Sequence, residues 1–385
     1  MLEPAERLAS EPRRPRRARM SLDAPSAPAP EAVEVRTPAR IHIGMLSFGH
    51  AGRRAYGGVG VMLDRPGVVL RAWRSPRFEA RGPLADRALQ FARQCAVDRG
   101  GGPLSCTIEV VSAPRSHVGL GSGTQLGLAV AAAIDALAAV PDAADPGQCR
   151  AVGSQPPRVP RIVGGERRFG ERDAIGLARV SGRGRRSCVG VYGFGGGGLI
   201  VEAGRAVTMP SVTEDDATRA FSPLVARVHL PEAWRCVLLI RRDAVGLHGE
   251  AERAAFGALP PMACEVSAEL ARIALLELVP AASEGRFAEF SDAVRRYGRL
   301  AGLPFEPAAH AVPHAAATTA LLDALADMGA PGAQSSWGPA VMACCDSSAA
   351  ARSLVERLGA AGIADDHDVT IARFDSVGAT LRVLA

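Results

Sequence analysis

The segment Pro114-Arg-Ser-His-Val-Gly-Leu-Gly-Ser-Gly-Thr-Gln125 constrains the fold most, because it separates two different hydrophobic periodicities. Before it, residues 106–111 alternate as a half-buried strand does, with Ile108 and Val110 on one side. After it, apolar residues recur every three or four positions over 126–140, which predicts one face of a helix of about four turns. The chain is therefore expected to run from a strand through a glycine-rich loop into a helix.

The loop has the composition of an anion-binding site. Gly119, Gly121 and Gly123 fall within five residues and are interleaved with the hydroxyl residues Ser122 and Thr124. At the start of a helix, free backbone N–H groups and the positive end of the helix dipole favour a bound anion. We therefore interpret the loop as a phosphate cradle.

The basic residues limit both the chemistry and the partners of the chain. All 45 are Arg, and without Lys the chain can form neither a Walker-type phosphate loop nor a Schiff base. The net charge is +5, but residues 1–19 hold six Arg and three acidic residues, so the remainder carries 39 Arg against 37 acidic residues. No nucleic-acid partner is expected from so small an excess.

Apolar runs such as 126–140 stop short of the roughly 20 residues that span a bilayer, so no membrane association is expected. No apolar run follows the paired arginines near the N-terminus, which argues against an export signal. The eight Cys are scattered without a C-x-x-C pair. Reduced thiols and a cytoplasmic location are expected.

Length and the mixture of strand and helix patterns predict an α+β protein of two domains. Residues 1–35 are rich in Arg, Pro, Ala and Glu, and we expect a disordered tail or an over-extended start, because Met20 could begin a shorter chain. A phosphate-binding domain is expected over 36–210. A C-terminal domain over 211–385 is expected to place helices on one face of an antiparallel sheet.

Residues 189–204 leave two interpretations open, because seven of them are glycine. Glycine allows the backbone to approach a neighbouring strand or a ligand closely. The segment is expected to form either a glycine-bent hairpin or a second wall of the ligand site.

Several segments together resemble one family of known proteins. Gly119-Leu-Gly-Ser122, at the mouth of the predicted helix, resembles the phosphate-binding motif of the GHMP small-molecule kinase superfamily. The full set resembles the beta-ribofuranosylaminobenzene 5'-phosphate synthase family within that superfamily, over about residues 36–385 in motif order. The set comprises Ala39-Arg-Ile-His42, Tyr56-Gly-Gly-Val-Gly60, Ser116-His-Val-Gly-Leu-Gly-Ser-Gly-Thr-Gln125, Gly246-Leu-His-Gly-Glu250 and Gln334-Ser-Ser-Trp-Gly-Pro339.

The resemblance implies both a fold and an activity. The fold would be GHMP-kinase-like, with an N-terminal ribosomal-protein-like α+β domain and a C-terminal ferredoxin-like α+β sandwich. The activity would be phosphoribosyl transfer from 5-phosphoribosyl 1-diphosphate to 4-aminobenzoate or 4-hydroxybenzoate, with decarboxylation. The products would be a C-riboside 5'-phosphate of tetrahydromethanopterin biosynthesis and diphosphate. Mg²⁺ is the implied cofactor with no ligands predicted, the implied partners are these small molecules, and a homodimer is left open.

The resemblance also implies roles for individual residues. Arg40, His42 and Ser122 are the expected catalytic residues: loop amides with Ser122 would bind the diphosphate, and Arg40 or His42 would hold the benzoate or a phosphate. Trp337 would either stack on the ring or anchor its loop in the core, and His248 would either fix its loop or contact a ligand. The residues expected to bind substrate are His117, Gly119, Leu120, Gly121, Gly123, Thr124, Gln125, Gln334, Ser335, Ser336 and Trp337.

Two alternative functions remain open. One is an ATP-dependent small-molecule kinase of the same superfamily, whose members typically carry an Asp after the second glycine-rich segment. Here Ser187 is followed by Cys-Val-Gly-Val, so the acid that would handle an acceptor hydroxyl is absent from that place. The other is a non-catalytic descendant that binds a phosphorylated metabolite and tolerates Cys188, where relatives of the family usually have Gly.

Overall fold

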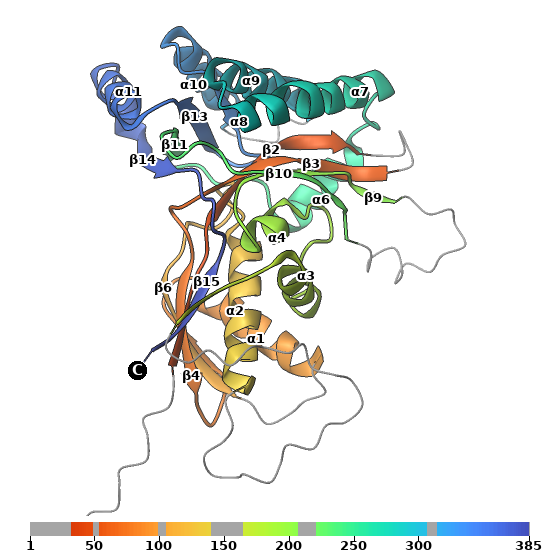
Figure 1. Ribbon diagram of the computed structural model, residues 1–385, viewed down its shortest axis with the longest axis vertical. Coiled ribbons are helices and arrows are strands. Elements are labelled where there is room, and N and C mark those ends of the chain that lie inside the picture. Colours follow the sequence, from red (N-terminus) through yellow and green to blue (C-terminus); the bar gives the residue numbers. More distant parts are fainter. Residues whose placement is uncertain are drawn as a thin grey trace, which may run out of the picture. The chain divides into compact units, whose positions relative to one another are not determined.

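A computed structural model describes residues 32–48, 54–98, 105–139, 165–206, 221–305 and 314–384. Within Glu31–Ala385, which forms one compact unit, helices pack against three β-sheets (Figure 1). Most of the tail expected at 1–35 lies outside the described residues, as does the boundary expected near residue 210. The division into two domains stays a prediction.

The first sheet has six strands, and its middle includes a strand that the sequence interpretation placed in the tail. β1 pairs antiparallel with β4 on one side and with β15 on the other, and its Val33 and Val35 are buried. The tail prediction is wrong for these residues because a strand of only five residues carries too weak a periodic signal beside a Pro-rich stretch. The strands in sheet order are β5 (Glu79–Arg81), β6 (Cys106–Ser112), β4 (Val69–Arg74), β1 (Ala32–Arg36), β15 (Thr380–Leu384) and β7 (Glu166–Arg168).

Three helices cover one face of this sheet (Figure 1). Central among them is α2, whose buried side chains pack against β1 and β4 on one side and against α1 and α3 on the other. None of the helices in the described part of the chain is long and apolar enough to cross a membrane. The three helices are α1 (Ala85–Asp98), α2 (Ser122–Ala139) and α3 (Glu171–Val180).

In the second sheet the two strands that follow residue 36 pair antiparallel, since Ala39 lies opposite Leu63 and Ser47 opposite Tyr56. The hairpin interpretation of 189–204 is wrong: its first part forms helix α4. A Cβ on Gly193 would lie 2.1 Å from the Met62 sulfur, so glycine here permits close packing rather than a bend. The elements are β10 (Leu224–Val228), β8 (Leu199–Glu202), β3 (Arg54–Leu63) and β2 (Ala39–Ser47), with β9 (Arg205–Ala206) beside β3 and α4 (Val189–Phe194) packed on the sheet.

The third sheet is antiparallel, as predicted, but helices lie on both of its faces, so the expectation of helices on one face is wrong. One face shares an apolar core with β2, β3, α7, α8 and α9, and the other packs against α10 and α11. The strands in sheet order are β12 (Gly332–Gln334), β13 (Ala340–Cys345), β11 (Arg235–Arg241) and β14 (His367–Arg373). The helical elements are α6 (Gly249–Ala258), α7 (Cys264–Ile273), η1 (Ala274–Leu278), α8 (Val279–Glu284), α9 (Phe287–Gly302), α10 (Ala315–Asp327), α11 (Ser348–Ala360) and η3 (Ile363–Asp366).

Candidate functional site

The predicted order of strand, loop and helix is confirmed, with β6 ending at Ser112 and α2 beginning at Ser122. Gly119 and Gly121 have φ of 96° and 67°, in the left-handed region that favours glycine. Thr124 N and Gln125 N donate to Gly121 O at 3.0 and 3.1 Å, which closes the first turn. Since the first N–H groups of a helix have no intrahelical acceptor, this turn presents donors to the space before α2.

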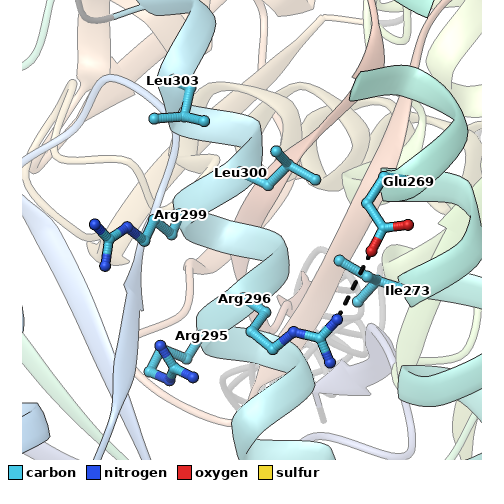
Figure 2. A pocket seen from close by; sticks show the side chains of 7 residues that line it. All are labelled: Glu269, Ile273, Arg295, Arg296, Arg299, Leu300 and Leu303. Carbon is cyan, nitrogen blue, oxygen red and sulfur yellow. Dashed lines mark ion pairs between the residues drawn. The ribbon is translucent and has the colours of Figure 1, made fainter. Parts of the chain in front are cut away.

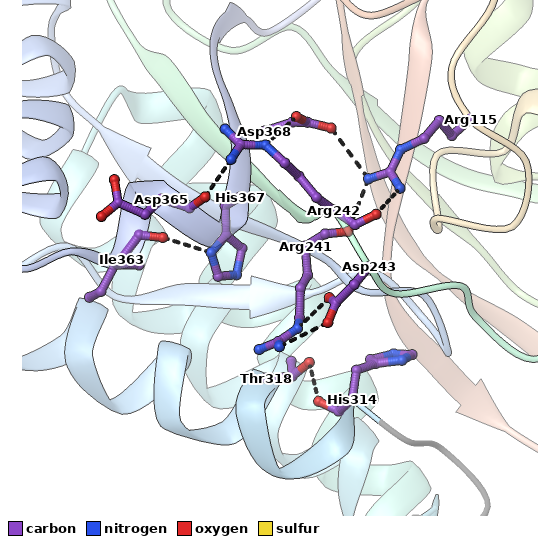
Figure 3. Close-up of polar contacts among 10 residues, drawn as sticks. All are labelled: Arg115, Arg241, Arg242, Asp243, His314, Thr318, Ile363, Asp365, His367 and Asp368. Carbon is purple, nitrogen blue, oxygen red and sulfur yellow. Dashed lines mark hydrogen bonds and ion pairs between the residues drawn. The ribbon is translucent and has the colours of Figure 1, made fainter.

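The start of the loop is fastened to the third sheet (Figure 3). The Arg115 guanidinium donates to the carbonyl oxygens of Arg241 and Arg242 at 2.9 and 2.7 Å, and lies 3.3 Å from the Asp368 carboxylate. Farther along the loop, Gly246 N donates to His117 O at 2.7 Å. The cradle is therefore held between α2, which follows it, and strands β11 and β14 of the third sheet.

Ser335 ties the cradle to β2. Its buried Oγ accepts a hydrogen bond from His42 N at 3.0 Å and donates one to Gly119 O at 2.7 Å. A Cβ on Gly119 would lie 2.8 Å from Ser335 O, so the two segments touch through backbone atoms. The structure thus brings Ser335, Gly119 and His42 together through a bridging hydroxyl, and their expected contacts with substrate stay predictions.

Replacing Ser335 with alanine is expected to lower the free energy of unfolding by about 2–4 kcal/mol, because His42 N and Gly119 O each lose a buried partner. Urea denaturation measures this change. Ser283→Ala, which removes an exposed hydroxyl that bonds only to Val279 O in α8, is the matched control and should cost about 0.5 kcal/mol or less. If both substitutions lowered the free energy of unfolding equally, the two hydrogen bonds of Ser335 Oγ would contribute no more to stability than an exposed hydroxyl does.

His42 is buried beneath the cradle. Its Nδ1 lies 3.1 Å from Ser336 Oγ, while its Nε2 is buried without a hydrogen-bond partner among the described residues. Burial, aided by the charge of Arg40, holds the pKa of His42 well below its usual 6.5. A neutral imidazole can donate a hydrogen bond to an anion but cannot form an ion pair with it, so of the two residues expected to hold one, Arg40 has the suitable charge.

The lowered pKa of His42 predicts a loss of stability in mild acid. As pH falls below the usual 6.5, His42 binds a proton in the unfolded chain but not in the folded one. The free energy of unfolding therefore falls by about 1.4 kcal/mol per pH unit. Urea denaturation between pH 7 and pH 5 should show a smaller loss for His42→Asn than for the parent. Identical slopes would mean that His42 does not titrate as described.

Three arginines converge on the cradle from separate elements. Arg40 comes from β2, Arg87 from α1 and Arg183 from the turn after α3. A Cβ on Gly121 would lie 3.3 Å from the Arg40 side chain, and one on Gly123 would lie 2.5 Å from Arg87 Nη2. The backbone of the first turn of α2 therefore lies directly against these side chains.

The arginine cluster, Arg40, Arg87 and Arg183, is positively charged, and the carboxylates of Glu202 and Glu252 act on it only from beyond ion-pair distance. Burial, together with the like charge of neighbouring arginines, lowers the pKa of Arg40 and of Arg183 to about 10, so both stay charged at neutral pH. No carboxylate of a described residue lies within ion-pair distance of the three. Half-buried positive charge without an ion-pair partner is costly, and an anionic ligand would supply that partner.

An acid does lie near the second glycine-rich segment, although it does not follow Ser187 in sequence. Glu202, at the end of β8, is fully buried and accepts from Cys188 N at 2.9 and 2.8 Å, while the hydroxyls of Ser187 and Ser222 also bond to it. Burial raises its pKa. Its two oxygens therefore already accept hydrogen bonds from Cys188 N and from two hydroxyls, and its place is fixed beside the start of α4.

The remaining predicted residues surround the loop. The His117 ring stacks on His248 at 3.9 Å, and His248 Nδ1 lies 3.1 Å from Gly246 O, which favours the loop-fixing role for His248. Gln125 and Gln334 donate to Gly190 O and Gly338 O at 2.8 and 3.0 Å. Leu120 is buried. The predicted contacts of these residues with substrate stay predictions.

Trp337 is 9% exposed and belongs to an aromatic cluster. Its ring meets those of Phe256 and Phe305 edge to face, with centroids 5.5 and 5.0 Å apart. Phe256 belongs to α6, and Arg186 lies over its other side. This packing agrees with the core-anchor interpretation, and stacking on a substrate ring stays a prediction.

Two surface hollows of about 290 and 320 Å³ lie away from the cradle. The first lies between α7 and α9 and contains the ion pair of Arg296 with Glu269 (Figure 2). The second includes Arg36 and Asp64. Neither is lined by a residue of the arginine cluster or of the loop.

Binding of Mg²⁺ would need side chains at the site that can coordinate it. Among the described residues, no group of three or more His, Cys, Asp or Glu side chains could hold a metal ion. Glu252, which lies near the cluster, is already paired with Arg186 at 2.9 Å. The residues present do not form a protein cage for Mg²⁺, so an ion here would depend on phosphate oxygens of a substrate for its ligands.

No protein-family model matches the chain. Beta-ribofuranosylphenol 5'-phosphate synthase of Archaeoglobus fulgidus is 31% identical over 276 residues, which cover 70% of this chain and 76% of the relative. The protein of the same name from Methanothermobacter thermautotrophicus is 27% identical over 325 residues, covering 81% and 88%.

Solved structures share the fold at low sequence identity. Homoserine kinase from Cytophaga hutchinsonii has a TM-score of 0.57 at 15% identity and covers 92% of this chain and 97% of its own. Mevalonate pyrophosphate decarboxylase from Streptococcus pyogenes has a TM-score of 0.58 at 11% identity, covering 91% and 99%. These likenesses confirm the GHMP-kinase-like α+β fold.

Proposed function

Because the chain belongs to the beta-ribofuranosylphenol 5'-phosphate synthase family, whose members are pentosyltransferase-type enzymes, we propose that it transfers the phosphoribosyl group of 5-phosphoribosyl 1-diphosphate to a para-substituted benzoate. The relatives' name specifies a phenol product, which 4-hydroxybenzoate would yield. With 4-aminobenzoate the product would be the aminobenzene analogue. Either product would enter tetrahydromethanopterin biosynthesis.

The proposed reaction needs no base to activate a hydroxyl. The ring carbon that bears the carboxylate attacks C1 of the ribose, the bond between C1 and the diphosphate oxygen breaks, and its electron pair leaves with diphosphate. Loss of carbon dioxide then returns the electron pair of the carbon–carbon bond to the ring, which restores aromaticity. This agrees with a site where Glu202 accepts hydrogen bonds from the chain itself and the pKa of His42 is low.

The observation that carries the proposal is the arginine cluster without carboxylate partners, set against the first turn of α2. Such a site suits a departing anion, whose growing charge it would stabilise. Arg40 would hold the benzoate carboxylate or a phosphate, and the loop amides with Ser122 and Thr124 would bind the diphosphate. Mg²⁺, if present, would enter with the diphosphate; it supplies charge neutralisation when bound.

The two alternatives, an ATP-dependent kinase and a non-catalytic binding protein, differ from this proposal in which phosphorylated donor the protein consumes. The protein is incubated with 5-phosphoribosyl 1-diphosphate and either benzoate, and in parallel with ATP and candidate alcohols, while ³¹P NMR follows each donor. We expect 5-phosphoribosyl 1-diphosphate to be consumed only when a benzoate is present. Conversion of ATP to ADP would indicate a kinase, and binding without consumption of either donor would indicate a non-catalytic descendant.

A further inference from the structure

The first turn of α2 is approached from two sides by different arginines. Arg40 lies against Gly121, whereas Arg87 lies against Gly123, so the two guanidinium groups meet successive parts of the turn. On the side of Arg87, Arg183 Nη2 donates to Thr124 Oγ1 at 3.3 Å. One side of the turn therefore carries a single arginine and the other carries two arginines with a hydroxyl.

Arg183 has donor capacity that the protein does not use. Its Nε is buried without a hydrogen-bond partner among the described residues, and burial with the charge of Arg87 lowers the pKa of the group to about 10. Burying an unpartnered charged donor costs free energy, as does placing it beside a like charge. A ligand with several acceptor oxygens and high negative charge would satisfy both groups at once.

We propose that Arg87, Arg183 and Thr124 form a clamp for the diphosphate leaving group, separate from the position that Arg40 serves. The proposal rests on the function proposed above. The donor carries two anionic groups, a diphosphate and a 5'-phosphate, and the more highly charged one is assigned to the side with two arginines. As the C1–O bond breaks, its electron pair moves onto the diphosphate oxygen, and the clamp stabilises the charge that grows there.

The clamp is tested by binding of diphosphate alone, measured by isothermal titration calorimetry with the full chain. Arg183→Met and Arg87→Met are each expected to raise the Kd for diphosphate about 10- to 150-fold, the range for loss of a hydrogen bond to a charged group. The Kd for ribose 5-phosphate should change less than threefold. Arg172→Met, which removes an exposed arginine of α3, is the matched control and should leave both values unchanged.

If Arg183 had a structural role, Arg183→Met would lower the unfolding temperature of the unliganded protein. The clamp predicts a different result. Because removal of one of several like charges relieves repulsion, unliganded Arg183→Met should unfold at a temperature no lower than that of the parent, while the thermal shift produced by diphosphate should shrink. Arg183→Lys, which keeps the charge but not the fork geometry, should bind diphosphate with an intermediate Kd.

The clamp and the proposed function can fail separately. Diphosphate binding that is equal in both variants and the parent would overturn the clamp, as would weakened binding of ribose 5-phosphate in its place. Absence of turnover in the parent, with the expected loss of diphosphate binding in the variants, would overturn the synthase assignment and leave the clamp standing.

Discussion

Gly119→Ala is expected to reduce kcat/KM by about 100-fold or more, because the substitution displaces the loop that begins the cradle. The φ of 96° is unfavourable for an L residue, and the added Cβ would lie 2.8 Å from Ser335 O, a backbone atom that cannot move aside alone. Steady-state kinetics with 5-phosphoribosyl 1-diphosphate and 4-hydroxybenzoate measures the loss.

Gly176→Ala provides the control for Gly119→Ala. Gly176 lies within α3, and a Cβ there would meet nothing within 4 Å. Alanine should therefore stabilise the helix by about 0.5–1 kcal/mol and leave kcat/KM unchanged. If Gly119→Ala retained the activity of this control, the backbone conformation of the loop would not matter for catalysis.

Arg40→Met is expected to lower kcat/KM by about 100- to 1,000-fold, because Arg40 is the arginine whose side chain lies against Gly121 of the cradle. Arg40→Lys should recover part of the activity, since it restores the charge without the bidentate geometry. The same kinetic assay measures both variants.

The matched control for Arg40 is Arg93→Met, on the exposed face of α1, which should retain the parent's kcat/KM. Arg40→Met should also keep a cooperative unfolding transition, because the Arg40 guanidinium forms no ion pair with a described residue. Activity of Arg40→Met within threefold of the parent would remove Arg40 from the site.

Local patterns predicted the centre of the site well. The change from strand to helix periodicity around residues 114–125 is confirmed by β6 and α2, and the left-handed φ of Gly119 and Gly121 explains why glycine occupies those positions. The family resemblance named both Ser335 and His42 as candidate site residues, and in the structure His42 N donates a hydrogen bond to Ser335 Oγ. Periodicity and residue type are enough to predict a loop whose conformation is set by one continuous segment.

Residues contributed by the tertiary fold were not predictable in this way. Arg87 and Arg183 belong to no motif, and they reach α2 only because α1 and α3 pack beside it. The run of arginine and glycine over 182–186 was visible in the sequence but gave no partner for Arg183. Glu202 was not predictable from its place in the sequence, because β8 brings this carboxylate to Cys188 from 14 residues away.

The central claim is that loss of diphosphate and loss of carbon dioxide belong to one reaction. It is tested most directly by incubating the protein with 5-phosphoribosyl 1-diphosphate and 4-hydroxybenzoate or 4-aminobenzoate labelled in the carboxyl group, and by counting both products. We expect labelled carbon dioxide and diphosphate in equal amounts, with neither formed when the benzoate is omitted. Diphosphate released in the presence of benzoate without labelled carbon dioxide would contradict the account.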